Sequence, residues 1–213
     1  MKLYLGSYLP WETGEDITPL VEMIGENKTM KIIMNGVDFS DDTARRAQSV
    51  AEAAKLFGQF GISVDELDLR DYFGKQNELE KALSGVGAIY AYGGNTYILR
   101  RAFRQSGLDE FLPKLLRRGV VYGGISVGSC VCAPTLRGLD GTDDPNIVPE
   151  KYEPEIIWDG LGLVPYSILP HYRSDHPESA SVEEDIKYFK KHNLPYKTLR
   201  DGEAIVVNDE EAE

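Results

Sequence analysis

A serine between two glycines is the residue best placed to do chemistry in this sequence. The segment Gly124-Ile125-Ser126-Val127-Gly128 matches the G-x-S-x-G pattern of a nucleophile elbow, a sharp turn between a strand and a helix. An apolar, β-branched stretch precedes it and small residues follow it. At such a corner the hydroxyl projects from the carboxyl edge of the sheet, where open α/β folds bind ligands. The pattern predicts a nucleophilic serine, and a plain turn or N-cap serine is the alternative.

A serine needs a base to be nucleophilic at neutral pH, and the chain has three histidines. His171 follows the apolar run SILP, so it emerges where a strand ends, at the same edge as Ser126. His176 lies in a polar turn, where we expect it to be solvated. His192 lies at the end of a helical pattern, where a cation complements the helix dipole. We therefore expect His171 to be the base.

Several acidic residues could orient His171. Asp143 and Asp144 lie in a long irregular stretch between the serine and the histidine. Asp201 and Glu203 follow the histidine and flank the last expected strand. The pattern leaves all four open.

Apolar stretches that alternate with helical patterns must position these side chains. The expected strands are 1–8, 31–38, 62–69, 88–94, 119–126, 167–172 and 203–207. The expected helices are 41–61, 76–83, 96–104, 108–118 with an interruption at Pro113, one that begins at Ser126, and 181–192 with Ser181 and Glu184 at capping-box spacing. This alternation predicts a three-layer α/β/α fold with a mostly parallel sheet, in a single domain over 1–213. The stretch 138–154 is the one long loop, and 208–213 is expected to be a frayed tail.

Composition narrows the class of protein. The formal net charge of −12 argues against nucleic-acid binding, which depends on Lys and Arg. No segment approaches the roughly 20 apolar residues of a membrane helix, and the N-terminus is too short and broken for a signal peptide. Cys130 and Cys132 lack a second ligand pair, so we expect two buried thiols in a reducing cytoplasm, and neither a metal nor a cofactor.

Four blocks, taken together and in this order, resemble one known family. They are YGGNTYIL at 92–99, GISVGS at 124–129, APTLR at 133–137 and LPHY at 169–172. This pattern is similar to the serine peptidase family of peptidase E, the aspartyl dipeptidase, and cyanophycinase. The resemblance implies a flavodoxin-like, class I glutamine amidotransferase-like fold in which a serine replaces the amidotransferase cysteine. It also implies Ser126 as nucleophile and His171 as base.

The resemblance extends to the other site residues. It implies that the N–H groups of Gly94 and Val127 form an oxyanion hole, and a Gly-Gly turn does let the backbone approach a ligand closely. We expect the neighbouring Gly93 and Asn95 to contact the substrate. In the family an Asp lies shortly before a proline after the nucleophile, which makes Asp143 the first choice for the acid.

Two departures from the family concern specificity. Val127 replaces the usual alanine of Gly-x-Ser-Ala-Gly, so its branched side chain is expected to narrow the pocket. The Gly-Glu-Thr-Arg stretch, whose arginine holds the substrate's aspartate in the family, is replaced by RSDHPESASVEE. We expect Arg173 to take over recognition of a carboxylate, with an exposed surface arginine as the alternative.

We therefore expect a cytoplasmic serine peptidase that acts on dipeptides or other small amides. Two other functions stay open: an α/β-hydrolase esterase, whose chain order is also Ser, Asp, His, and a catalytically silent protein that binds amino acids or peptides. We expect the chain to bind a small peptide or amide substrate, and neither nucleic acid nor a membrane. If the chain assembles, we expect a homodimer.

Overall fold

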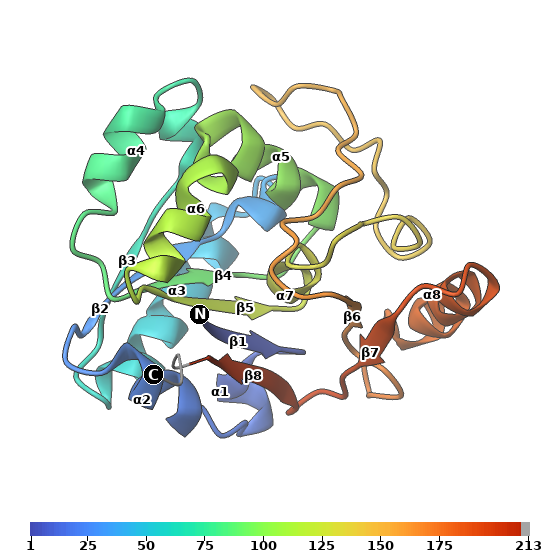
Figure 1. Cartoon of the computed structure of the whole chain (residues 1–213), viewed down its shortest axis with the longest axis horizontal. Helices are drawn as coiled ribbons and strands as arrows, with labels where there is room; N and C mark the ends of the chain where they lie inside the picture. Colours follow the sequence, from blue (N-terminus) through green and yellow to red (C-terminus); the bar gives the residue numbers. More distant parts are fainter. Residues whose placement is uncertain (210–213) are drawn as a thin grey trace.

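A six-stranded sheet forms the centre of the computed structural model, which describes residues 1–209 (Figure 1). The strand order is β3-β2-β4-β5-β1-β8, and neighbours run parallel except for β8, which is antiparallel to β1. These strands are β1 (Lys2–Gly6), β2 (Thr29–Ile33), β3 (Ser63–Glu66), β4 (Ala88–Ala91), β5 (Val121–Ile125) and β8 (Ala204–Asn208). The expected mostly parallel α/β fold is confirmed. Of the tail expected to fray, residues 210–213 lie outside the described residues.

The central strands are buried on both faces, which explains why they read as continuous apolar runs. Along β4 the side chains alternate between two cores. Ala88 and Tyr90 pack into one core, and Ile89 and Ala91 pack into the other. Helices therefore have to cover both faces of the sheet.

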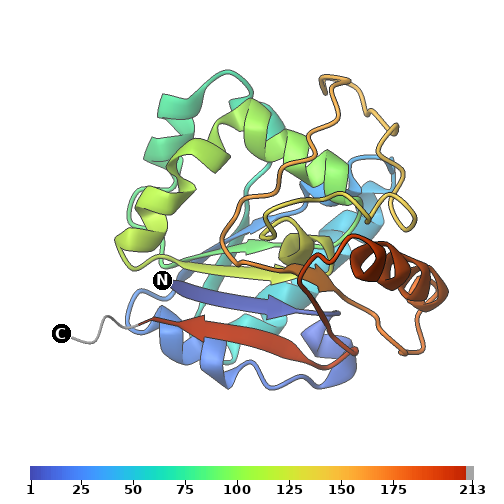
Figure 2. The ribbon, with the colours of Figure 1, turned by 45° about the vertical axis from the view of Figure 1, so that its right-hand side comes forward.

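The helices form the two outer layers, as Figures 1 and 2 show. One face carries α2 (Thr18–Ile24) and α3 (Thr43–Gly58), with the short α1 (Pro10–Thr13) beside them. The other face carries α5 (Thr96–Ser106), α6 (Leu108–Arg117), α4 (Gln76–Ala82) and the one-turn α7 (Val127–Cys130). Two short 3₁₀ turns, Asn35–Val37 and Leu69–Tyr72, follow β2 and β3.

A smaller unit lies beside the sheet, at the right in Figure 1. It contains α8 (Ser179–Lys191) and the parallel pair β6 (Ser167–Leu169) and β7 (Tyr196–Thr198). Its core includes Leu169, Phe189 and Cys130 of α7, so it is packed against the helix that follows the serine. Both cysteines are buried and free, as expected.

The structure corrects three local predictions. Helix α6 continues through Pro113, because the buried leucines on both sides of the proline hold it against the sheet. Helix α8 begins at Ser179 with Glu178 as its N-cap, so the capping box at Ser181 and Glu184 is wrong. The helices α1 and α2 and the strand β7 were not predicted, since each is short and lacks a long apolar period.

Three strand ends meet at the carboxyl edge of the sheet. In the register of the sheet, Gly6 of β1 and Ala91 of β4 lie opposite Ile125 and Gly124 of β5, respectively. The loops that follow therefore start side by side, so Ser126 emerges beside the chain that leaves β1 and β4. No helix among residues 1–209 is both long and apolar enough to cross a membrane.

Candidate active site

Ser126 lies on a strained turn between β5 and α7. Its φ of 51° and ψ of −118° belong to a region that costs a non-glycine residue roughly 1–3 kcal/mol. Glycines are required on both sides because the turn is tight: a Cβ on Gly124 would lie 2.4 Å from the carbonyl oxygen of Gly128, and one on Gly128 would lie 2.2 Å from that of Ala91. The Ser126 N–H donates to the Gly6 carbonyl over 3.1 Å, which ties the turn to β1.

A continuous chain of hydrogen bonds leads away from the serine hydroxyl. Ser126 Oγ lies 3.1 Å from Nε2 of His171, and Nδ1 of His171 lies 2.8 Å from Oδ1 of Asp201. His171 is buried just after β6. Its φ of 59° is a backbone conformation that L-residues rarely adopt. The expected pairing of Ser126 with His171 is the one that the structure brings together.

Asp201 occupies the place of the orienting acid. Its Oδ1 also accepts a hydrogen bond of 2.8 Å from the Ser7 hydroxyl, and its N–H donates to Oγ of Ser174 over 2.8 Å. Ser7 in turn accepts the His171 N–H over 2.8 Å, so one buried hydroxyl holds both the histidine and the acid. Because the acid follows the histidine in the chain, the order is Ser, His, Asp, which removes the argument for an α/β-hydrolase esterase.

The first choice for the acid, Asp143, is corrected by this geometry. Its Oδ2 accepts the N–H of Thr96 over 2.9 Å at the start of α5, and both ring nitrogens of His171 are taken by other residues. The other two candidates are occupied locally. Asp144 accepts bonds from Asn146, and Glu203 accepts the N–H of Arg200.

The surroundings of His171 favour its neutral, proton-accepting form. Burial lowers its pKa, the nearby His176 lowers the pKa further, and the bond to Asp201 opposes both effects. His176 stacks on His171 with ring centroids 3.7 Å apart and planes 10° apart, and Tyr8 meets both rings edge-on. His176 thus lies in a turn, as expected, but it is only partly exposed and its ring packs on the ring of His171.

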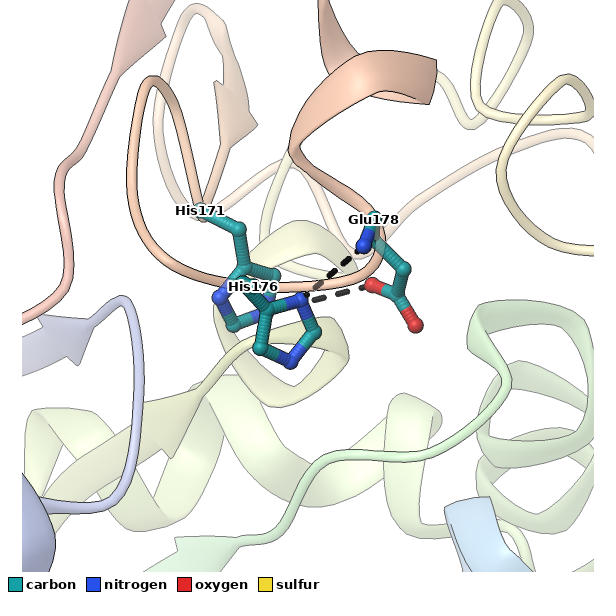
Figure 3. Close-up of side chains that lie close together, drawn as sticks. All are labelled: His171, His176 and Glu178. Carbon is teal, nitrogen blue, oxygen red and sulfur yellow. Dashed lines mark hydrogen bonds and ion pairs between the residues drawn. The ribbon is translucent and has the colours of Figure 1, made fainter.

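Glu178 completes this side of the site (Figure 3). Its N–H donates to Nδ1 of His176 over 3.2 Å, and its carboxylate lies 3.9 Å from Nε2 of His171. Burial, followed by the charges of nearby carboxylates, raises the pKa of Glu178 to about 7. The ligand atoms of His171, His176 and Glu178 lie within 4.8 Å of one another and could hold a metal ion. A metal there would compete for the atom of His171 that faces Ser126, so metal binding and a serine mechanism exclude each other.

The turn after β4 lies beside Ser126. A Cβ on Gly93 would lie 3.4 Å from Cβ of Ser126 and 3.7 Å from its Oγ. Gly94 has a φ of +130°, and a Cβ there would lie 2.3 Å from the Gly36 carbonyl. Within residues 1–209 the N–H groups of Gly94 and of Val127, the first residue of α7, donate to no other group. Both are therefore free to bind an oxyanion.

The structure separates the other expected site residues. Gly93 lines the large cavity described below, but Asn95 is the N-cap of α5: its Oδ1 accepts the N–H groups of Tyr97 and Ile98, and its Nδ2 donates to the Asp144 carbonyl. This buried amide caps the helix and does not line the large cavity, so the structure gives Asn95 a structural role there.

Arg173 is also corrected. Its side chain is 61% exposed, pairs with Glu183 over 3.0 Å and lies over the ring of Tyr172, outside the cavity. The surface alternative is the right one. The side chain of Val127 does not narrow the large cavity either, since it lines a second, smaller cavity on another side of the serine.

The large cavity has a volume of about 540 Å³ and reaches from Ser126 and His171 to the start of α3. It is lined by three arginines. Arg46 and Arg70 are committed to ion pairs with carboxylates that include Asp38 and Asp68. In the described part of the chain Arg45 makes no ion pair, although the exposed Asp41 and Asp42 line the same wall. A substrate carboxylate that enters this cavity meets Arg45 as an available cation.

Sequence reasoning missed Ser7, Glu178 and Arg45. Ser7 was detectable, because it lies at the carboxyl end of the predicted strand 1–8 and so at the same edge as Ser126. Glu178 and Arg45 carried no such signal, because they sit at the starts of helices whose placement around the cavity depends on the whole fold.

Comparisons with known proteins point to one family. The model of "Peptidase family S51" matches residues 41–213. "Peptidase E" of Streptomyces coelicolor is 35% identical over 61% of this chain and 52% of its own length. The "Probable alpha-aspartyl dipeptidase" of Drosophila melanogaster is 35% identical over 62% of this chain and 55% of its own. The chain thus spans about half the length of these relatives. The crystal structure of a peptidase E candidate from Listeria monocytogenes EGD-e superposes with a TM-score of 0.78 at 23% identity, covering 99% of this chain and 95% of that one.

Proposed function

The chain belongs to peptidase family S51, and on that basis we propose that it is a serine peptidase that cleaves dipeptides or other small amides. The observation that carries the proposal is the hydrogen-bonded series Ser126–His171–Asp201 at the wall of a cavity of about 540 Å³. A cavity of this size suits a small ligand. The two free thiols support placing this activity in the cytoplasm.

The geometry supports the following reaction. Ser126 Oγ attacks the carbonyl carbon of the scissile amide while Nε2 of His171 takes the hydroxyl proton. Asp201 holds the proton on Nδ1 and stabilises the imidazolium that forms. The developing oxyanion accepts hydrogen bonds from the N–H groups of Gly94 and Val127.

The second half reverses the proton transfer. The imidazolium protonates the leaving amine as the C–N bond breaks, which leaves an acyl ester on Ser126. Water, deprotonated by His171, attacks this ester, and His171 returns the proton to Oγ of Ser126 as the C–O bond breaks and the acid product leaves. No cofactor enters this sequence of steps.

A fluorophosphonate probe tests the nucleophile. Such a probe forms a phosphonyl ester with an activated serine and releases fluoride, so we expect stoichiometric labelling that is absent in Ser126→Ala. On a dipeptide panel with Asp, Glu, Leu or Lys first, Ser126→Ala should lose about 10⁵-fold or more in kcat.

The same experiments test the silent binding protein, the remaining alternative. Absence of labelling across the neutral and mildly alkaline pH range, together with dipeptide binding without turnover, would establish that alternative. A fall of less than tenfold in Ser126→Ala would show that another group is the nucleophile.

A further inference from the structure

A second cavity adjoins Ser126 and has no part in the mechanism above. Its volume is about 20 Å³, and its walls include Ser126 and Val127. A space of this size holds one water molecule or one group of similar size, such as an ammonium. Ser126 and Glu178 border both this small cavity and the large one, so the two cavities meet at Ser126.

Three carboxylates surround the small cavity. Asp143, Glu178 and Asp185 all line it, and each has a raised pKa because of burial, reaching about 7 for Glu178 and about 6 for Asp185. Asp143 and Asp185 make no ion pair with any residue in 1–209, and Glu178 pairs only with His171, which is held neutral. The cavity thus holds three carboxyl groups whose charged forms burial disfavours and no resident cation stabilises, so a cation that entered it would be bound by them.

An unpartnered hydroxyl provides a separate observation. Thr96 is 1% exposed and lines the same cavity, and its Oγ1 makes no hydrogen bond with the described part of the protein. Leaving a buried hydroxyl without a partner costs free energy, so native proteins rarely do so without a reason. Its neighbour Asp143 already accepts the N–H of Thr96, which places the carboxylate beside the hydroxyl. A ligand with several N–H donors would satisfy both groups.

The arrangement favours an organic ammonium over a metal ion. Within residues 1–209, the group whose ligand atoms converge within 4.8 Å is His171, His176 and Glu178, and it includes neither Asp143 nor Asp185. Metal ligands must converge at about 2.0–2.6 Å from one ion, whereas an ammonium bridges acceptors that are farther apart.

We propose that the small cavity binds the α-ammonium group of the substrate's first residue, through Asp143, Glu178 and the hydroxyl of Thr96. The proposal rests on the proposed peptidase function and specifies its substrate class. An α-ammonium is two bonds from the carbonyl carbon that Ser126 attacks, so its subsite must border the nucleophile, as this cavity does. A side-chain ammonium of lysine would lie several bonds farther away.

The consequence is exopeptidase specificity set by charge. The small cavity takes the free amino terminus and closes the site on that side, so only one residue can precede the scissile bond. The rest of the substrate extends into the large cavity, where Arg45 is available for a carboxylate.

Binding to Ser126→Ala tests the subsite without turnover. Calorimetry compares two free-amine dipeptides, alanyl-alanine and aspartyl-alanine, with their desamino analogues, propionyl-alanine and succinyl-alanine. The analogues are smaller, so steric exclusion cannot explain a loss. We expect each analogue to bind about 100-fold more weakly, since a buried charge loses its partner.

Variants identify the groups. In the Ser126→Ala background, Asp143→Asn and Glu178→Gln should each weaken free-amine dipeptides by about 10–100-fold and the analogues by far less. Thr96→Val should reduce the free-amine preference by about threefold to tenfold, because a single neutral hydrogen bond is lost. Glu183→Gln is the matched control on α8: its carboxylate pairs with Arg173 at the surface, so the change should stay below about threefold.

Three results would overturn the proposal. The first is binding of the desamino analogues as tightly as the free-amine dipeptides. The second is a free-amine preference that persists unchanged in Asp143→Asn and Glu178→Gln. The third is no binding of either free-amine dipeptide. Fluorophosphonate labelling of the unaltered protein does not need an ammonium, so it reports separately on the proposed peptidase function.

Discussion

Replacing Asp201 should separate the charge of the acid from its hydrogen bonds. Both the Ser7 hydroxyl and Nδ1 of His171 lie 2.8 Å from the same oxygen, Oδ1. In Asp201→Asn the amide oxygen can take the place of Oδ1 and accept both bonds, which leaves the imidazole in the correct tautomer. The variant then loses only the negative charge.

The magnitude follows from that geometry. A hydrogen bond to a charged group is worth about 1.5–3 kcal/mol and a neutral one about 0.5–1.5, so the imidazolium loses about 1–1.5 kcal/mol of stabilisation. This corresponds to about a tenfold fall in kcat. Asp201→Ala removes the acceptor altogether. The Ser7 hydroxyl can turn to the Leu199 carbonyl 3.5 Å away, but Nδ1 keeps no partner, and we expect a loss of about 10³–10⁴.

Steady-state kcat on the best dipeptide and the rate of fluorophosphonate labelling measure both variants, with thermal unfolding as the check that they are folded. A folded Asp201→Ala protein that keeps more than a tenth of the labelling rate would refute the assignment of Asp201. If Asp143→Asn abolishes labelling while Asp201→Ala does not, the role of the acid returns to Asp143.

Three further predictions concern the base, the oxyanion hole and the cavity. Because the pKa of His171 is lowered, kcat/KM should fall on acidification only below the pKa of a free imidazole. His176→Ala removes one cause of the lowering, so the acidic limb of the pH profile should move to higher pH. His192→Ala, at the end of α8, is the control and should leave that limb unmoved. Gly94→Ala should cost at least about 10²-fold in kcat or prevent folding, because the new Cβ would lie 2.3 Å from the Gly36 carbonyl. Normal kinetics in a folded variant would contradict the placement of this turn. Arg45→Ala should raise KM for dipeptides by about tenfold with little change in kcat, whereas Arg173→Ala should change neither, and the reverse pattern would restore Arg173 as the carboxylate-binding residue.

The sequence predicts that Ser126 and His171 come together, because each lies just after an apolar strand. Ser126 directly follows β5 of the central sheet, whereas β6, which precedes His171, pairs with β7 in a separate two-stranded sheet. The expectation that both residues end strands of one sheet is therefore wrong, although the two side chains do meet. The glycines around Ser126 add a local signal, since their close contacts are with the same turn and with the adjacent strand β4.

The acid could not be chosen in the same way. Asp143 and Asp201 both lie close in the sequence to predicted helices or strands, so local sequence favours neither. The choice between them depends on the antiparallel pairing of β8 with β1. That return brings Asp201, just before β8, next to Ser7 at the end of β1. A pairing between residues about 200 positions apart leaves no local periodicity to detect, and acidic residues are too frequent here for composition to decide.

The end of β1 is where the stability and the activity of this site are coupled. Ser126 and His171 both have positive φ, and their N–H groups are held by the Gly6 carbonyl and the Ser7 hydroxyl, respectively. Ser7→Ala leaves the buried His171 N–H without its acceptor and removes one of the two hydrogen bonds to Oδ1 of Asp201. We therefore expect a loss of about 1–3 kcal/mol in the free energy of unfolding, together with a fall of about tenfold in kcat. Urea unfolding measures the loss of stability, and kcat, measured beside that of Asp201→Asn, measures the loss of activity. A Ser7→Ala protein with unchanged stability would show that the strained backbone of His171 does not depend on this hydroxyl.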